Sequence, residues 1–379
     1  MSQFYNPVRL YFDEDGATRV AEAIRERYAE VRRVLILTRG GEAERSECML
    51  PIMAALASKE VRVIALELAN PDISDLLHLH RELFEYDFEL VIAVGGGSVL
   101  DLAKALTATK GAIWHTEEDV RRTITSEEYR RKMRYTPWIG IPTTSGTGSE
   151  VTSWATVWDR EKKLKYSISD TMLYAEYAVI LPQLTLGIPL RLSVVTALDA
   201  MCHAAESYWS VNTNPVTRSY AIQAIERIVG SLPRLREDPS SEKVRRELAL
   251  ASMFAGLAFS NTMTNACHSI SYPLTLLYGI EHGIATSITL GGVLKLNQHS
   301  ILDLDRLLGA FGARKVEDVQ RIVFGLYEQY GIATQLRAYG VSMEYVEVLA
   351  ERAYTKGRMN YNPVALSHMQ VQELLTTLL

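Results

Sequence analysis

The sequence predicts an α/β protein of two domains, with a parallel-sheet domain over residues 1–183 and an all-α domain over residues 184–379. In the first half, short β-rich apolar runs alternate with amphipathic stretches, which is typical of βαβ units and a parallel sheet. After Pro189 the sequence changes to long Ala/Leu/Glu/Arg-rich stretches with apolar residues at helical spacing. The length of 379 residues also exceeds the roughly 250–300 residues at which one hydrophobic core stops growing.

Four apolar runs are the expected strands of the sheet: Arg33–Thr38, Val61–Leu66, Leu90–Val94 and Trp138–Pro142. Prolines and glycines between residues 180 and 190 break regular structure, so the domain boundary is placed there. In the helical half, prolines are expected to interrupt the helices because proline lacks a backbone N–H. They occur at Pro215, Pro233, Pro239 and Pro273.

The composition is that of a soluble globular protein, with 47% hydrophobic and 22% charged residues. No run approaches the roughly 18 apolar residues of a membrane span, and the N-terminus lacks the pattern of a secretory signal, so a cytoplasmic protein is expected. A net charge of -5 without a long basic run disfavours nucleic acid and anionic membranes as partners and favours small molecules. Three cysteines without Cys-x-x-Cys spacing, Cys48, Cys202 and Cys267, are expected to be reduced and structural.

Two glycine-containing loops follow expected strands. The first, Gly95–Ser98, lies between the strand ending at Val94 and an Ala/Leu-rich helix, where free helix N-terminal amides favour a pyrophosphate. The second, residues 142–150, carries hydroxyls and glycines after the next strand. Ligands of parallel sheets bind at the carboxyl edge, so the pair indicates a dinucleotide site. Either loop alone could be a tight turn, and neither has the Gly-Lys-Ser/Thr ending of a P-loop, which disfavours ATP hydrolysis.

A carboxylate and three histidines in the helical half form a candidate metal site. Asp199 and His203 stand at i and i+4, so they share one helix face. His268 and His282 follow downstream. Imidazole and carboxylate ligands suit iron(II) or zinc. The other histidines lack such a pattern and are interpreted as ordinary core or surface residues: His78, His80, His115, His299 and His368.

With these motifs in this order, the chain resembles the iron-containing alcohol dehydrogenases over nearly its whole length. The resemblance rests on Gly-Gly-Gly-Ser-Val-Leu-Asp at 95–101, Pro-Thr-Thr-Ser-Gly-Thr-Gly-Ser-Glu-Val-Thr at 142–152, Leu-Thr-Leu-Gly-Ile-Pro at 184–189 and the Asp/His/His/His set. It implies an N-terminal dinucleotide-binding domain, a helical metal-binding domain, an active site in the cleft between them and a homodimer.

The resemblance also implies roles for individual residues. The metal ligands would be Asp199, His203, His268 and His282. Contacts with NADPH or NADH would come from Thr38, Arg39, Asn70, Gly96, Gly97, Ser98, Thr143, Thr144, Thr147 and Lys165. The candidate catalytic residues are Asp101, Tyr272 and Arg358, although a helix-capping role is the alternative for Asp101.

Three positions depart from the family pattern. Tyr272 stands where many relatives carry a histidine near the nicotinamide, and Leu181 replaces an aspartate before Pro182. Arg39 stands where NAD-using relatives often carry an acidic residue that binds ribose hydroxyls. An arginine there would instead bind a 2′-phosphate, which predicts a preference for NADPH, unless Arg39 is an ordinary exposed side chain.

The implied activity is the reduction of an aldehyde, or the oxidation of an alcohol, with a nicotinamide cofactor and a metal. The run from Ala266 to Thr275 resembles the branch of the family that reduces phosphonoacetaldehyde to 2-hydroxyethylphosphonate, and Lys356 and Arg358 are candidate phosphonate contacts or solvated surface residues. Another short-chain or hydroxylated aldehyde is the alternative substrate. A dehydroquinate synthase-like lyase and a regulatory protein that has lost catalysis are the competing classes.

Overall fold

A computed structural model describes residues 3–40, 45–67, 70–354 and 357–379 of the chain, so Lys356 lies outside the described residues. The chain forms two compact units. The α/β unit contains Asn6–Thr144 and Ser149–Thr185, and the helical unit contains Leu186–Leu379, Ser145–Gly148 and the N-terminal residues through Tyr5.

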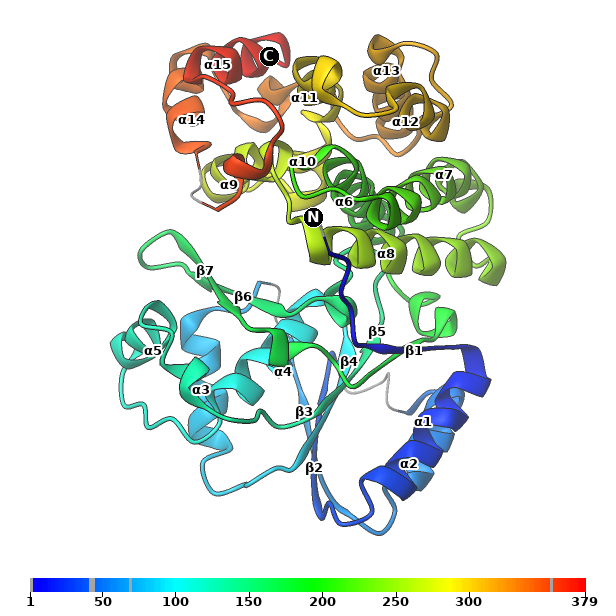
Figure 1. The fold of residues 1–379 in the computed structure, drawn as a ribbon, viewed down its shortest axis with the longest axis vertical. Coiled ribbons are helices and arrows are strands. Elements are labelled where there is room, and N and C mark those ends of the chain that lie inside the picture. Colours follow the sequence, from blue (N-terminus) through cyan, green and yellow to red (C-terminus); the bar gives the residue numbers. More distant parts are fainter. Residues whose placement is uncertain (1–2, 41–44, 68–69, 355–356) are drawn as a thin grey trace. The chain divides into compact units, whose positions relative to one another are not determined.

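Six parallel strands form the sheet of the α/β unit, in the order β1-β8-β5-β4-β2-β3 (Figure 1). The strands are β1 (Arg9–Phe12), β2 (Arg33–Thr38), β3 (Glu60–Ala65), β4 (Leu90–Gly95), β5 (Trp138–Pro142) and β8 (Tyr177–Ile180). The four expected strands are therefore confirmed within one residue at each end. The short edge strand β1 and its neighbour β8 are additional to the expected strands.

Helices cover both faces of this sheet. Successive residues of a strand point to opposite faces, so each central strand contributes side chains to both buried layers. Val34 and Ile36 of β2 pack in one buried cluster with residues of α1 (Asp13–Arg27) and α2 (Leu50–Ala55). Leu35 and Leu37 pack in another with residues of α3 (Ile73–Glu82), α4 (Gly97–Thr109) and α5 (Glu117–Thr125). The apolar runs of β2 and β4 are thus buried on both sides, whereas the edge strand β3 is partly exposed.

An antiparallel hairpin of β6 (Trp154–Asp159) and β7 (Leu164–Ser169) completes the α/β unit. Arg121 of α5 connects to it through a buried ion pair, with Arg121 Nε 2.7 Å from Asp159 Oδ2. The hairpin also pairs with the segment after β3, where Trp158 N donates to Pro71 O at 2.8 Å and Asp72 forms a β-bridge with Trp158. The hairpin is therefore anchored close to the loop that carries Asn70.

In the described part of the helical unit every regular element is a helix, as the sequence predicts. The α-helices are α6 (Leu190–Trp209), α7 (Pro215–Glu237), α8 (Glu242–Thr262), α9 (Ala266–Tyr278), α10 (His282–Ser287), α11 (Leu290–Asn297), α12 (Leu304–Phe311), α13 (Val316–Gln329), α14 (Val346–Arg352) and α15 (His368–Thr377). Among the described residues, no helix is both long enough and apolar enough to span a membrane.

Two of the four prolines do not interrupt helices as expected. Pro215 begins α7 and Pro239 lies between α7 and α8, but Pro233 lies inside α7 and Pro273 inside α9. A helix tolerates an internal proline when tertiary packing outweighs the lost hydrogen bond. Pro273 is itself buried, and both helices contribute residues to the core of the unit.

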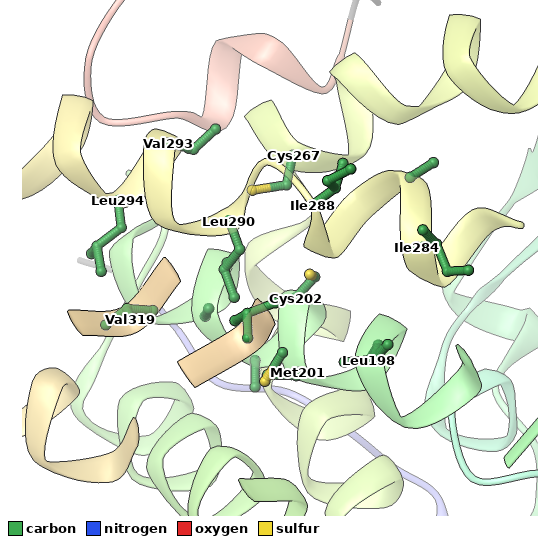
Figure 2. Close-up of a cluster of buried hydrophobic side chains, with 14 of the residues drawn as sticks. Leu198, Met201, Cys202, Cys267, Ile284, Ile288, Leu290, Val293, Leu294 and Val319 are labelled. Atoms are coloured by element: carbon green, nitrogen blue, oxygen red, sulfur yellow. The ribbon is translucent and has the colours of Figure 1, made fainter. Parts of the chain in front are cut away.

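Part of the core of the helical unit lies among α6, α9, α10 and α11 (Figure 2). Leu198, Met201 and Cys202 of α6 share this core with Cys267 of α9. All three cysteines of the chain are free thiols in buried positions, and burial raises the pKa of Cys202 and Cys267 well above the ordinary value. Their structural role, expected from the sequence, agrees with this packing.

The two units do not divide at one point, in contrast to the single boundary expected after residue 183. Residues Ser145–Gly148 group with the helical unit because two glycines let the loop backbone approach its helices. A Cβ on Gly146 would lie 2.5 Å from Thr196 Cβ in α6, and one on Gly148 would lie 2.5 Å from Gly256 Cα in α8. The N-terminal segment joins the same unit because Tyr5 N donates to Asn261 Oδ1 of α8 at 2.7 Å.

Candidate metal centre and cofactor-binding edge

Three helices bring the predicted metal ligands together. Asp199 and His203 lie one turn apart on α6, His268 lies in the first turn of α9, and His282 is the first residue of α10. The ligand atoms of Asp199, His268 and His282 all lie within 4.8 Å of one another. Asp199 and His282, which are 83 residues apart in the sequence, thus lie together with His268.

Asp199 is at the centre of this group. Its Oδ1 lies 3.4 Å from His268 Nε2 and 3.8 Å from His282 Nε2, and its Oδ2 lies 3.9 Å from His203 Nε2. Burial disfavours the ionised form of Asp199, but the three neighbouring imidazoles outweigh it and hold the pKa of this carboxyl below its usual range. The carboxylate is therefore ready to bind a cation.

The donor set fits a divalent cation. Within the described part of the chain, Asp199 Oδ1 and His268 Nε2 are buried without a hydrogen-bond partner, although they face each other. A buried polar atom without a partner costs free energy, about 1–3 kcal/mol, which a cation bound between these atoms would remove. Nitrogen and oxygen donors of this kind suit iron(II) or zinc.

His203 lies beside the group of three rather than within it. Its ring is stacked between Phe259, at a centroid distance of 4.1 Å, and His268, at 4.5 Å. Burial lowers the pKa of His203 to about 4, which keeps the imidazole neutral, as a metal ligand must be. The predicted role of His203 as the fourth ligand remains a prediction.

Glu206 is a residue of this site that the sequence interpretation did not select. It lies on α6 seven residues after Asp199 and is completely buried, and its Oε2 is 2.5 Å from His268 Nδ1. Burial opposes its ionisation, but the charge and hydrogen bonds of His268 lower the pKa of Glu206. The spacing 199, 203, 206 places all three side chains on one helix face, a signal that could have identified it.

The predicted cofactor residues of the α/β unit lie at one edge of the sheet. Thr38 ends β2, Gly96 and Ser98 follow β4, and Thr143 and Thr144 follow β5, where Thr143 N donates to Gly95 O at 3.0 Å. Strands β2, β4 and β5 are neighbours, and the strand order reverses between β2 and β4. Open parallel sheets bind ligands at such a switch point, outside the carboxyl ends of the strands.

The start of α4 offers a place for an anion at this edge. Gly96 is the N-cap and Gly97 begins the helix, so the amides of Gly97 and Ser98 have no intrahelical acceptor. A Cβ on Gly96 would lie 3.2 Å from Thr144 Oγ1, which brings the two predicted loops into contact. Gly96 of the first loop and Thr144 of the second therefore lie side by side within the α/β unit.

Both the N–H and the carbonyl group of Asn70 are hydrogen-bonded. Asn70 has a left-handed φ of 59°, its N–H donates to Ser98 Oγ at 3.1 Å, and Arg160 donates to its carbonyl at 3.2 Å. Lys165, in β7 of the same hairpin as Arg160, has its ammonium 5.4 Å from the centre of the Trp158 ring. The hairpin that carries Lys165 therefore also contacts the segment that carries Asn70, through Arg160.

Asp101 lies within α4 and does not cap it. Its Oδ1 accepts from Ser149 Oγ at 2.5 Å, its Oδ2 accepts from Thr156 N at 2.9 Å, and it pairs with the buried Lys104 at 3.3 Å. These contacts hold the segment after the second loop against α4. The catalytic role suggested for Asp101 remains a prediction.

The other predicted residues lie in different places. Arg39 is exposed directly after β2, and Thr147 belongs to the loop segment of the helical unit. Tyr272 is buried in α9, with its ring stacked parallel to that of His282 at 6.1 Å. Arg358 directly precedes the short helix η10 (Met359–Tyr361), which packs against α9.

Known proteins resemble the chain along its whole length. A family model described as iron-containing alcohol dehydrogenase matches residues 7–182, and one described as the C-terminal part of the Fe-containing alcohol dehydrogenase family matches residues 193–379. NADPH-dependent butanol dehydrogenase from Clostridium saccharobutylicum is 28% identical over 356 residues, which cover 90% of each protein.

Two further relatives are similar over most of the chain. Phosphonoacetaldehyde reductase from Streptomyces viridochromogenes is 30% identical over 315 residues, covering 78% of each protein. The crystal structure of sulfoacetaldehyde reductase from Bifidobacterium kashiwanohense in complex with NAD+ aligns with a TM-score of 0.86 and 25% identity, covering 100% of this chain and 98% of that one. With both halves matched by models of one family, the chain belongs to the iron-containing alcohol dehydrogenases, which are oxidoreductases.

Proposed function

We propose that the protein is an NAD(P)H-linked reductase of a small aldehyde that carries an anionic group, with phosphonoacetaldehyde as the specific candidate. The observation that carries the reductase activity is the convergence of Asp199, His268 and His282 within 4.8 Å. Two relatives described above are named as reductases of phosphonoacetaldehyde and sulfoacetaldehyde, each of which combines an aldehyde with an anionic group. This similarity supports the substrate class.

When bound, a divalent ion supplies a Lewis acid for the carbonyl oxygen and NAD(P)H supplies the hydride. The contribution of the chain is to hold these groups in place. Asp199 and the histidines would hold the divalent ion, and the amides at the start of α4 would hold the pyrophosphate of the cofactor. Tyr272, beside His282, is the candidate donor of the proton that the substrate oxygen takes up as hydride reaches carbon. The aldehyde, NAD(P)H and a proton then yield the alcohol and NAD(P)+.

Arg358 is the candidate contact for the anionic group. It precedes η10, and η10 packs against α9, the helix that carries His268 and Tyr272. Within the described part of the chain, its guanidinium donates only to Met263 Sδ, at 4.0 Å, so no carboxylate neutralises it. A guanidinium can donate two parallel hydrogen bonds to phosphonate oxygens, which an ammonium cannot do.

Steady-state kinetics of the iron-loaded enzyme with phosphonoacetaldehyde and butanal test the proposal. Replacing Arg358→Ala removes charge-assisted hydrogen bonds worth about 1.5–3 kcal/mol, so the KM for phosphonoacetaldehyde should rise roughly tenfold to hundredfold. The KM for butanal should change little, and the exposed Arg352→Ala on α14 should leave both constants unchanged.

Equal effects of Arg358→Ala on the two substrates would contradict the role of Arg358. A native enzyme that reduces butanal but not phosphonoacetaldehyde would favour the alternative, a short-chain or hydroxylated uncharged aldehyde, and would leave the reductase activity standing. The lyase alternative loses its support because both halves of the chain match models of the alcohol dehydrogenase family.

A further inference from the structure

Glu206 connects the helix that carries Asp199 to the helix that carries His268. It lies on α6, and its completely buried carboxylate reaches the first turn of α9. Its Oε2 accepts from His268 Nδ1 at 2.5 Å and from Asn265 N at 3.0 Å. Its Oε1 accepts from Cys267 N at 2.5 Å and from His268 N at 3.2 Å. The carboxylate therefore accepts hydrogen bonds both from backbone amides at the start of α9 and from the imidazole of His268.

We propose that Glu206 is a positioning residue for the metal site, which holds the ring of His268 in the tautomer and orientation that metal binding needs. A carboxylate at Nδ1 requires a proton on that nitrogen and leaves the lone pair on Nε2. Nε2 is the atom that faces Asp199 Oδ1, at 3.4 Å, and lacks a hydrogen-bond partner among the described residues. Carboxylate partners of this kind strengthen metal binding by histidine.

The charge of Glu206 also suits a buried divalent cation. Burying an unbalanced charge is costly, and Asp199 alone leaves a divalent ion with one positive charge in excess. Glu206 supplies the second negative charge through the ring of His268 without occupying a coordination position. Two carboxylates with neutral imidazoles therefore balance the ion.

Glutamine cannot replace Glu206 in either orientation of its amide. Each carboxylate oxygen accepts from two N–H groups, so the NH2 group of glutamine would face two donors on one side. In one orientation the NH2 group would face the backbone N–H groups of Cys267 and His268. In the other it meets Asn265 N–H and His268 Nδ1, which forces the ring into the tautomer with its proton on Nε2. The first orientation sets donor against donor at the start of α9 and so displaces His268, and the second removes the lone pair from Nε2.

The inference rests on the metal site of the proposed function. Measuring zinc binding distinguishes a failure of the Glu206 role from a failure of the metal site itself. We would measure the zinc affinity of native protein, Glu206→Gln and Ser207→Ala by competition with a chelator. Glu206→Gln should lower the affinity about tenfold to hundredfold. Ser207→Ala is the matched control, because it removes a buried hydrogen bond to Thr262 Oγ1 at 3.0 Å, one residue further along α6, without touching His268.

A Glu206→Gln affinity within twofold of native, or an equal loss in Ser207→Ala, would overturn the role of Glu206. Native protein that binds no zinc would overturn the metal site as well. If Glu206→Gln does not fold, nitrogen-15 NMR of histidine-labelled, zinc-loaded native protein decides. A proton bonded to Nδ1 of His268 with zinc on Nε2 supports the inference, and zinc on Nδ1 overturns it.

Discussion

Gly283 lies directly against the backbone of Val195, so that a Cβ on Gly283 would be 1.9 Å from the Val195 carbonyl oxygen. Gly283 follows His282 at the start of α10, and Val195 lies on α6, one turn before Asp199. The absence of a side chain at Gly283 therefore sets how closely the helix of one metal ligand approaches the helix of another.

Gly283→Ala should destabilise the protein by about 1–3 kcal/mol, because a methyl group must displace α10 from α6. The same displacement should move His282 and weaken zinc binding. Urea unfolding and zinc titration measure the two effects. Gly325→Ala in α13 is the control, since a Cβ there meets no atom within 4 Å and the change should be neutral or slightly stabilising. Equal stability of the two variants would contradict the steric argument.

Loss of a metal ligand should abolish metal binding and activity together. His268→Ala and His203→Ala, purified and analysed for iron and zinc, should each contain much less metal than native protein. The exposed His299→Ala should keep both metal and activity. Full metal content with full activity in both ligand variants would refute the assignment, and a normal His203→Ala alone would remove His203 from the ligand set.

The cofactor preference should depend on Arg39. Arg39→Asp replaces a potential donor to a 2′-phosphate by a group that repels it, so the ratio of kcat/KM for NADPH to that for NADH should fall at least about tenfold. Arg32→Asp makes the same charge change just before β2, at the opposite end of the strand, and should leave the ratio unchanged. An unaltered ratio in Arg39→Asp would identify Arg39 as an ordinary exposed side chain.

Glu150 should make the stability of the protein depend on pH. Burial raises the pKa of Glu150 to about 7, and the opposing effect of Lys104 is smaller. A carboxyl whose pKa is raised on folding stabilises the native state below its unfolded pKa, and this stability is lost as the pH rises through the folded value. Glu150→Gln should therefore gain stability relative to native protein between pH 4.5 and 8, on the order of 3 kcal/mol.

Urea unfolding across that pH range measures this difference. The exposed Glu85→Gln is the control and should show the same difference from native protein at every pH. A difference for Glu150→Gln that does not change with pH would show that Glu150 titrates near its ordinary pKa when folded.

Local patterns in the sequence determined much of the α/β unit and the placement of Asp199 and His203 on one helix face. The buried strands β2, β4 and β5 were predictable because their apolar runs are continuous. The shared helix face of Asp199 and His203 was predictable from their i, i+4 spacing. The glycine loops were predictable because they directly follow those strands. The four-residue strand β1 was not, because its register depends on pairing with β8, with Arg9 opposite Tyr177.

Only the tertiary structure decided which distant residues meet. His268 and His282 reach Asp199 because α9 and α10 pack against α6, and no local pattern contains that packing. Glu206 acquires its partners in the same way, since all four of its donors come from the start of α9. Periodicity fixes the face on which a side chain lies, whereas the contacts of that face depend on how helices far apart in sequence bury their apolar surfaces together.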